Sequence, residues 1–464
     1  MLRYFRINDP YRLLALFVLL ALITVPLIIT SPAITVVELK SFLVGEKVAE
    51  GNTLYTDIID RTPPLASWFY GLCDLMFGRN ITVRHIIAIL VVFLQGAFLA
   101  IVFIDKRAFT ENTYVPALLF ALIALISFDM FSLTADLVAS AFLLLALNAV
   151  LTEIEFRVQR DETIFIAGFF AGAASLLNFT HLVFLPGIFI ILVIFSRNGL
   201  RKYLLMLSGF LLPHALIAVV FYVNGNGGDL LNRFYQENIL PEHSKLIGIQ
   251  SLLMLGAIPL VALTLSFFIV SRQAHLTKYQ AQVSQVMFLW LLLGLIQLLL
   301  TPDFRPQSLL PVLPVVAFYT THWLLLIRRR KFAEWGVWLL LIGSVSTLYL
   351  SLHSRLPVDY SRLYVRASSA SATGKRVLSL TDDPGIYVNN SVAPPFIDWP
   401  MTRHIFDQSN QYDDVLLVAR LFRSDPPDII IDPEKRMEGF FARLPAVRDM
   451  YEKKADGTWT LISN

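Results

Sequence analysis

Acidic and basic side chains gather in one stretch, residues 38–65, directly after the first long apolar run of the chain. A charged side chain costs about 2.5–3.5 kcal/mol at the centre of a bilayer, so charge collected beside an apolar run indicates a functional site. An ordinary solvated loop is the alternative. Carboxylates can accept or steer a proton, and lysine and arginine can hold an anion. The candidates are Glu38, Asp57, Asp60, Lys40, Arg61 and Tyr55.

Three further charged residues stand at the ends of apolar runs. Asp136 lies in Thr-Ala-Asp-Leu before the run 137–152, Arg84 precedes the run 86–104, and Arg305 precedes Leu310. The planar guanidinium of arginine can bond two oxygens of a phosphate at once. Anchoring to lipid headgroups is the alternative for each arginine, and it is the better reading of Arg84 and Arg233 taken singly.

The elements that must position these residues are membrane spans. Of the 464 residues, 56% are hydrophobic and only 16% are charged, whereas a soluble domain has about 25% charged residues. The sequence therefore predicts a polytopic α-helical membrane protein with about 11 transmembrane helices. The apolar runs lie at 13–30, 86–104, 113–128, 137–152, 163–177, 182–195, 203–223, 251–270, 283–300, 309–327 and 335–352.

Positive charge alternates between the loops. With a cytoplasmic N-terminus, the outside loops 129–136, 178–181 and 301–308 hold only Arg305, as the positive-inside rule requires. The outer loop 31–85 and the C-terminal residues then lie outside. The short pair 163–177 and 182–195 is also compatible with a re-entrant hairpin, which would leave the other orientations unchanged. The inside bases are Lys106, Arg107, Arg157, Arg160, Arg197, Arg201, Lys202, Arg272, Lys278 and the run Arg328–Lys331.

The composition changes after residue 352. We expect a membrane domain at 1–352, a linker at 353–373 and a small soluble α/β domain at 374–464. Apolar runs followed by turn residues predict strands at Arg376–Leu380 and Asp428–Ile431, and the periodicity predicts a helix at Asp413–Phe422. Trp459–Ile462 follows an Asp-Gly turn and is predicted to be the last strand of a hairpin.

The ordered set of residues in the first loop resembles the GT-C fold glycosyltransferases that use polyprenyl-phosphate sugars, within them the aminoarabinose transferase and protein O-mannosyltransferase-like group. The likeness implies a membrane glycosyltransferase (hexosyl- or pentosyltransferase) that moves a sugar from a polyprenyl-phosphate donor to a lipid, glycan or protein acceptor on the outer face of the membrane. It also implies a multi-pass protein of the bacterial inner membrane, with its C-terminal domain periplasmic or extracellular. The matching residues are Glu38, Glu50-Gly51, Tyr55, Asp57, Pro63-Pro64-Leu65, Trp68, Phe77-Gly78 and Arg84, and more loosely Asp136 and Arg305.

The resemblance also assigns roles. A lipid phosphate is a good leaving group, so the reaction needs a carboxylate for the acceptor and cations for the phosphate. Glu38, Asp57 and Asp136 are expected to be catalytic and to converge, with Tyr55 and Asp60 as further candidates. Two positions depart from the family pattern, because Val37 replaces an acid and Thr62 replaces a lysine. The expected phosphate ligands are Lys40, Arg61, Arg84 and Arg305.

Partners and cofactors follow from the same residues. No spacing predicts a metal-ligand motif, although a divalent cation held by carboxylates near the phosphate stays open. The net charge of +3 and the single cysteine, Cys73, favour neither nucleic-acid binding nor a disulfide framework. The expected partners are membrane lipid, the polyprenyl-phosphate sugar and an acceptor. A transporter would need charged or helix-breaking residues in the middle of its spans, whereas the mid-span positions here are nearly all apolar. A catalytically silent GT-C-like scaffold or lipid-binding protein remains the alternative function.

Overall fold

The computed structural model describes residues 1–30, 34–155, 161–195, 199–239, 245–273, 276–353, 355–368, 373–407, 411–454 and 457–462. The chain is mostly helical (71%) and divides into two compact units. The first unit comprises Met1–Pro32, Asn80–Ile217 and His243–Arg362. The second comprises Ala33–Arg79, Ala218–Glu242 and Leu363–Asn464. Residues 374–464, predicted as a domain of their own, therefore share a unit with two earlier segments.

The predicted apolar runs are helical, and the fold is that of a polytopic α-helical membrane protein with a small C-terminal sheet. Among the described residues, seven helices are long and apolar enough to cross a membrane, or eight if the pair Ile249–Leu255 and Ala257–Arg272, bent by 70°, forms one span. The seven are Tyr11–Ile29, Ile81–Asp105, Ala135–Ile154, Leu200–Val223, Lys278–Leu300, Pro306–Leu326 and Arg330–Leu352. Because the remaining apolar helices are shorter, the count of eleven spans stays a prediction. Of the predicted inside bases, Arg157, Arg160 and Arg197 lie outside the described residues.

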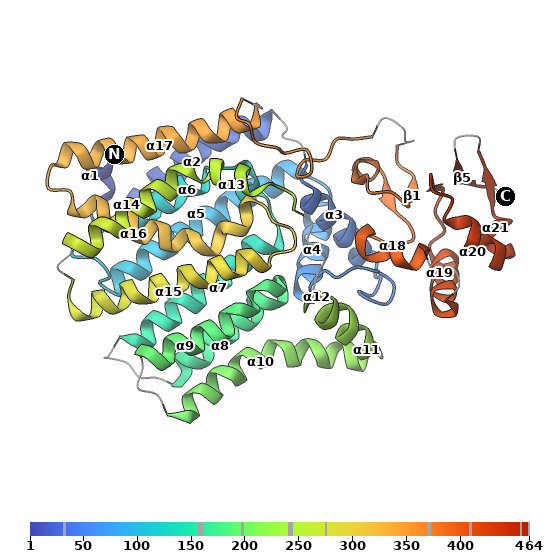
Figure 1. Cartoon of the computed structure of the whole chain (residues 1–464), viewed down its shortest axis with the longest axis horizontal. Coiled ribbons are helices and arrows are strands. Elements are labelled where there is room, and N and C mark those ends of the chain that lie inside the picture. The colour runs from blue at the N-terminus through green and yellow to red at the C-terminus, as the bar shows by residue number, and fades with distance from the viewer. Residues whose placement is uncertain are drawn as a thin grey trace. The chain divides into compact units, whose positions relative to one another are not determined.

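The first unit is a bundle of apolar helices (Figure 1). Its elements are α1 (Leu2–Phe5), α2 (Tyr11–Ile29), α5 (Ile81–Asp105), α6 (Val115–Ala124), η1 (Phe128–Phe131), α7 (Ala135–Ile154), α8 (Asp161–Leu177), η2 (Phe179–Val183), α9 (Phe184–Phe195), α10 (Leu200–Val223, which runs on into the second unit), α13 (Ile249–Leu255), α14 (Ala257–Gln273), α15 (Lys278–Leu300), η4 (Pro306–Val312), α16 (Leu313–Leu326) and α17 (Arg330–Leu352).

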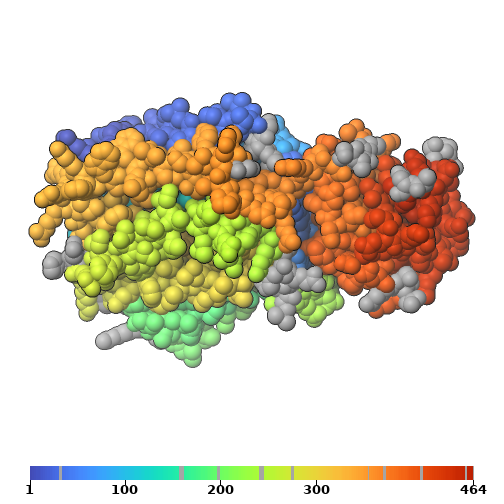
Figure 2. Space-filling model, turned by 45° about the horizontal axis from the view of Figure 1, so that its top comes forward, coloured from blue at the N-terminus to red at the C-terminus, as the bar shows by residue number. Residues whose placement is uncertain are grey.

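Two contacts illustrate how these helices pack. The surfaces of α2 and α17 lie side by side (Figure 2), and the Tyr349 hydroxyl donates to the Ile23 carbonyl oxygen at 2.9 Å. Helices α8 and α10 approach so closely that a Cβ at Gly168 would lie 2.1 Å from the carbonyl oxygen of Met206. Small residues allow such backbone contact between apolar helices, where packing rather than water exclusion stabilises the pair.

The second unit combines helices from the first loop with the C-terminal segment (Figure 1). Helix α3 (Val36–Ala49) packs on α4 (Pro64–Phe77), and a Cβ at Gly45 would lie 2.6 Å from the Tyr70 carbonyl oxygen. Pro64 is the first residue of α4, where the missing N–H costs nothing. The short segment after α10 contains α11 (Gly227–Asp229), the π-helix η3 (Leu230–Gln236) and α12 (Glu237–Ile239).

The C-terminal segment forms a five-stranded sheet of order β2-β1-β3-β5-β4. Strand β1 pairs in parallel with β2 and β3, and β5 pairs antiparallel with β3 and β4. The predicted strands, the helix and the terminal hairpin are therefore present, with shifts of one or two residues at their ends. The elements are β1 (Arg376–Ser379), η5 (Pro384–Val388), β2 (Ser391–Val392), α18 (Trp399–Asp407), α19 (Tyr412–Ser424), β3 (Ile429–Ile431), α20 (Met437–Arg443), α21 (Pro445–Arg448), β4 (Tyr451–Lys453) and β5 (Thr458–Leu461).

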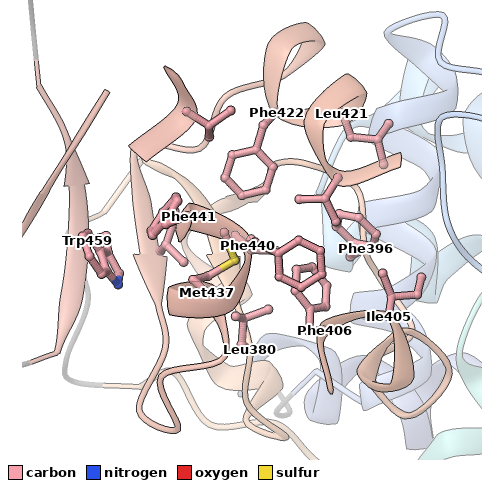
Figure 3. Packing of buried hydrophobic residues seen from close by; sticks show 14 of the residues in the cluster. Leu380, Phe396, Ile405, Phe406, Leu421, Phe422, Met437, Phe440, Phe441 and Trp459 are labelled. Atoms are coloured by element: carbon pink, nitrogen blue, oxygen red, sulfur yellow. The ribbon is translucent and has the colours of Figure 1, made fainter. Parts of the chain in front are cut away.

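Two hydrophobic clusters explain why this segment is joined to the first loop. In one, aromatic rings such as Phe396, Phe406 and Phe440 pack around the sheet (Figure 3), and Ile59 from the first loop is a fully buried member of the same cluster. In the other, Leu39 and Leu43 of α3 pack with Val377 and other strand residues. Burying a large aliphatic side chain stabilises by about 1.5–3 kcal/mol, so residues of the first loop and its helix α3 contribute to both clusters that stabilise the sheet.

Candidate active site

A short strand-like pairing brings the charged loop to the C-terminal segment. Ile59 and Phe396 form an isolated parallel bridge, in which the Ile59 N–H donates to the Pro395 carbonyl oxygen at 3.0 Å. Since side chains alternate along extended chain, the residues two positions further on, Arg61 and Asp398, are placed side by side. The register of this bridge thus decides which C-terminal residue meets the loop.

Two cations and two carboxylates meet at this point, and we call them the charge cluster: Lys40, Asp60, Arg61 and Asp398. The Nζ atom of Lys40 lies 3.1 Å from Asp60 Oδ1 and 3.1 Å from Asp398 Oδ2. Arg61 Nε lies 2.9 Å from the same Asp398 oxygen. Lys40 lies on α3, Asp60 and Arg61 lie in the loop between α3 and α4, and Asp398 directly precedes α18.

The loop itself holds Asp60 in place. Asp60 is fully buried, and its Oδ1 accepts hydrogen bonds from the Thr62 N–H at 2.6 Å and the Thr62 hydroxyl at 2.7 Å. Asp60 Oδ2 is buried too and has no hydrogen-bond partner among the described residues. A buried polar atom without a partner costs about 1–3 kcal/mol, so such an atom in a native fold needs an explanation. A ligand that donates a hydrogen bond would supply one.

Tyr55 stabilises the same loop through its buried side chain. Its backbone has φ of 72°, a conformation that is uncommon for a residue other than glycine. The ring is fully buried, and the hydroxyl donates to the Thr62 carbonyl oxygen at 2.6 Å. Burial, with the negative charge of Asp60 adding to it, raises the pKa of Tyr55 well above its ordinary value. The hydroxyl therefore remains protonated and acts as a hydrogen-bond donor.

Charge in the cluster is balanced. Burial opposes ionisation of Asp398, but the positive charges of Lys40 and Arg61 outweigh this and lower the pKa of Asp398 below its ordinary value. Asp398 is therefore an anion bound by two cations. The chemistry that the cluster offers is thus the binding of an anionic group beside carboxylate oxygens.

The segment after α10 adds a third carboxyl group. The Asn238 side chain donates to the Arg61 carbonyl oxygen at 3.1 Å, which fixes α12 beside the loop. Glu237, the preceding residue, has a buried Oε2 without a hydrogen-bond partner in the described part of the chain. Burial raises the pKa of Glu237, and the charges of Arg233 and Arg61 oppose that shift while Asp398 adds to it. Glu237 was not among the predicted residues.

Glu38 and Asp57, the two predicted catalytic acids of this loop, stabilise local turns. Glu38 closes a capping box at the start of α3, in which its side chain accepts from the Thr35 N–H and hydroxyl, both at 3.0 Å. Asp57 Oδ2 accepts from the Thr53 N–H at 2.9 Å, within the turn that contains Tyr55. Hydrogen bonds of these kinds are common for Glu and Asp at helix starts and turns.

Asp136 and Arg305 meet in the first unit. Arg305 is fully buried; its Nη2 lies 2.7 Å from Asp136 Oδ2, and its Nη1 lies 2.8 Å from Asp129 Oδ1. Asp129 also accepts from the Gln307 N–H at 2.8 Å, and Thr134 accepts from Arg305. The guanidinium thus joins the ends of α7, η1 and η4. This ion-pair network indicates a structural role for Arg305 in the first unit. Its predicted contact with a phosphate stays a prediction.

The predicted site residues therefore fall into groups. The structure brings Lys40, Arg61 and Asp60 together, and it brings Asp136 and Arg305 together in the other unit. Arg84 is buried in the first turn of α5. The convergence of Glu38, Asp57 and Asp136 stays a prediction. In the described residues, no group of three or more His, Cys, Asp or Glu side chains could hold a metal ion.

Sequence reasoning missed Asp398, Glu237 and Asp129. Asp398 reaches Lys40 across 358 positions of the chain, and Asp129 reaches Arg305 across 176. Neither the periodicity of the sequence nor the spacing of its motifs predicts a contact between residues so far apart in the chain. A signal for Glu38 was present, because Thr35 followed three positions later by a glutamate is the sequence pattern of a capping box.

Comparisons with known proteins agree with this architecture. Residues 61–222 match the family described as dolichyl-phosphate-mannose-protein mannosyltransferase. The crystal structure of ArnT from Cupriavidus metallidurans bound to undecaprenyl phosphate superposes with a TM-score of 0.55 at 13% identity, covering 93% of this chain and 94% of ArnT. The Archaeoglobus fulgidus oligosaccharyltransferase in its apo form gives a TM-score of 0.50 at 11% identity, covering 98% of this chain and 74% of that enzyme. None of the curated proteins compared with the sequence matches it.

Identities this low establish the fold alone, and the matched family segment covers about a third of the chain. Both structural relatives are GT-C glycosyltransferases. The apolar helices, the C-terminal sheet and the matched segment all agree with the resemblance predicted from the first loop. The chain is thus a multi-pass membrane protein of the GT-C fold, similar to the glycosyltransferases that use polyprenyl-phosphate sugars.

Proposed function

We propose that this protein is a membrane glycosyltransferase that moves a sugar from a polyprenyl-phosphate donor to an acceptor hydroxyl or amine. The observation that carries the proposal is the charge cluster. It combines two cations suited to a phosphate with a buried carboxylate, Asp60, one oxygen of which has no hydrogen-bond partner in the described part of the chain. The likeness to ArnT, which was crystallised with undecaprenyl phosphate, supports this class of donor.

Lys40 and Arg61 are the proposed ligands of the donor phosphate. Both side chains are partly exposed, with 24% and 12% of their surface accessible, so a phosphate can reach them with modest rearrangement. When the acceptor oxygen or nitrogen attacks the anomeric carbon, the bond from that carbon to the phosphate oxygen breaks. The departing polyprenyl phosphate gains negative charge, which these cations stabilise.

A carboxylate must take or steer the acceptor proton. Of the acids in the first loop, Asp60 suits this role best, because its Oδ2 has no hydrogen-bond partner among the described residues. Glu38 and Asp57 serve a capping box and a turn. In the proposed step the acceptor proton passes to a carboxylate oxygen as the new glycosidic bond forms. Asp136, paired with Arg305, is proposed as a further catalytic residue.

The proposed setting is the bacterial inner membrane, with the first loop and the C-terminal segment on the outer face. The alternation of positive charge in the sequence supports this orientation. Cysteines introduced at positions 106 and 383 would test it: labelling from outside is expected at 383 and not at 106. The reverse pattern would overturn the orientation.

Binding and turnover test the activity. We expect the purified full chain in nanodiscs to bind undecaprenyl phosphate, and Arg61→Gln to weaken binding by about tenfold or more, because a charge-assisted hydrogen bond is worth about 1.5–3 kcal/mol. Arg376→Gln, which removes a more exposed arginine paired with Asp425 and Asp428, is the matched control. Absence of binding by the unmodified chain would overturn the proposal.

One observation favours the second candidate, a silent GT-C-like protein that binds lipid. Glu38, which occupies the acidic position matched to the family, is engaged in the capping box of α3. A panel of undecaprenyl-phosphate-linked hexoses and pentoses separates the two candidates. Release of undecaprenyl phosphate in the presence of an acceptor extract supports the transferase, whereas tight binding without release of any member supports the silent protein.

A further inference from the structure

Asp398 occupies the position that the proposed function gives to the donor phosphate. One of its oxygens, Oδ2, lies 3.1 Å from Lys40 Nζ and 2.9 Å from Arg61 Nε. The same two cations are the proposed phosphate ligands. An acidic side chain of the C-terminal segment is therefore already bound where a lipid phosphate would bind.

The two carboxylates of the charge cluster differ in how firmly they are held. Asp60 is tied to its own loop by two hydrogen bonds from Thr62 in addition to Lys40. Asp398 contacts both cations through a single oxygen, Oδ2. Its other oxygen accepts a long bond, 3.4 Å, from the Met401 N–H. Rotation of the Asp398 side chain would remove its contacts with both cations and leave Lys40 paired with Asp60. Displacement of Asp60 would also break its two hydrogen bonds with Thr62.

The charge balance within the cluster favours that rotation. Two cations and two carboxylates sum to zero, so a phosphate that enters without displacing a carboxylate leaves excess negative charge in a mostly buried site. Buried charge without a partner is costly. A phosphate also offers more acceptor oxygens than the single atom Asp398 Oδ2, and arginine can bond two of them at once.

We propose that Asp398 is an internal competitor of the lipid phosphate: it holds Lys40 and Arg61 in place when no donor is bound, yields to the donor phosphate, and returns to help expel the polyprenyl phosphate product. This inference rests on the proposed function. The competing anion is built into the chain at the start of α18, so the C-terminal segment tunes the affinity of the site for phosphate. When the polyprenyl phosphate product leaves, the Asp398 carboxylate replaces it as the anion bound to Lys40 and Arg61.

Asp398→Asn is the direct test, because asparagine keeps the size of the side chain and is an equally good residue at a helix start. The measurement is equilibrium binding of undecaprenyl phosphate to the full chain in nanodiscs, with undecaprenol as the probe that lacks phosphate. We expect Asp398→Asn to bind undecaprenyl phosphate about tenfold tighter than the unmodified chain, because a competing charge-assisted contact is removed. Undecaprenol binding should not change.

Asp425→Asn is the matched control. Asp425 is also a carboxylate of the second unit, and it is paired with Lys47 at 2.8 Å. Asp425→Asn therefore measures how the removal of one negative charge from this unit affects phosphate binding in general. Phosphate affinity should be unchanged in this variant. Asp398→Ser, another favourable residue at a helix start, repeats the test if the asparagine variant folds poorly, and thermal melting identifies that case.

The outcomes separate this inference from the function on which it rests. Tighter binding in Asp398→Asn or Asp398→Ser supports competition. Equal or weaker binding, while the unmodified chain binds undecaprenyl phosphate, overturns it and makes Asp398 a positioning or structural residue. If neither the unmodified chain nor any variant binds, the proposed function itself is wrong.

Discussion

Exchanging Arg305 for methionine tests whether this arginine organises the first unit. The guanidinium makes bonds of 2.8 Å to Asp129, 2.7 Å to Asp136 and 3.1 Å to Thr134. Asp129 is fully buried, so the variant leaves a buried carboxylate that has lost its cation and still accepts from the Gln307 N–H. Removing one member of a buried ion pair typically costs about 3–5 kcal/mol, mostly because the remaining charge is uncompensated.

A second exchange isolates that cause. Asp129→Asn combined with Arg305→Met removes the buried charge, so it should recover much of the lost stability, because replacing both members of a buried pair is often close to neutral. The assay is thermal melting of the purified chain in detergent, with undecaprenyl phosphate binding measured in parallel. An unchanged melting temperature in Arg305→Met together with lost phosphate binding would refute the structural role and favour the phosphate contact predicted from the sequence.

Three further predictions concern the second unit. Tyr55→Phe removes the hydroxyl that donates to the Thr62 carbonyl oxygen and should cost about 1–3 kcal/mol; proteolysis within residues 50–63 would detect the loosened loop, and a wild-type digestion pattern would contradict this. Gly45→Ala places a Cβ 2.6 Å from a backbone oxygen of α4, so we expect this steric clash to lower the melting temperature. At Gly51 an added Cβ meets no atom but the backbone has positive φ, so Gly51→Ala measures the effect of backbone strain without a clash. Burial lowers the pKa of Lys47, but Asp425 and Glu50 outweigh it and raise the pKa above the ordinary value of 10.5. The stabilisation from this pair is therefore complete below pH 10.5 and is lost as pH rises through the raised pKa, so a melting curve of Lys47→Met should lack the alkaline decline of the unmodified chain.

Much of the fold can be predicted from local sequence, and much of the site cannot. The apolar runs predict helices because the bilayer imposes length and hydropathy on every span. The strands β1 and β3 were predicted within two residues, since short apolar runs beside turn residues are a local pattern. The grouping of 374–464 with the first loop was not predicted, because it depends on the packing of Ile59 into a distant core.

The charge cluster shows the same division. Lys40, Asp60 and Arg61 were predicted from their place beside an apolar run, whereas Asp398 depends on the register of a single bridge between residues 59 and 396. Shifting that bridge by one residue would turn the neighbouring side chains to the opposite face. A register between segments more than 300 residues apart is set by packing, which the sequence does not display.

The parallel bridge between Ile59 and Phe396 also has a consequence for biogenesis. A ribosome makes about 5–20 residues per second, so on the order of tens of seconds pass between synthesis of the first loop and synthesis of Asp398. During that interval Lys40, Asp60 and Arg61 exist without the carboxylate that balances their charge, and Ile59 exists without its core. Until the last quarter of the chain has been made, the nascent first loop therefore exposes an apolar side chain and a charge imbalance that the complete fold removes.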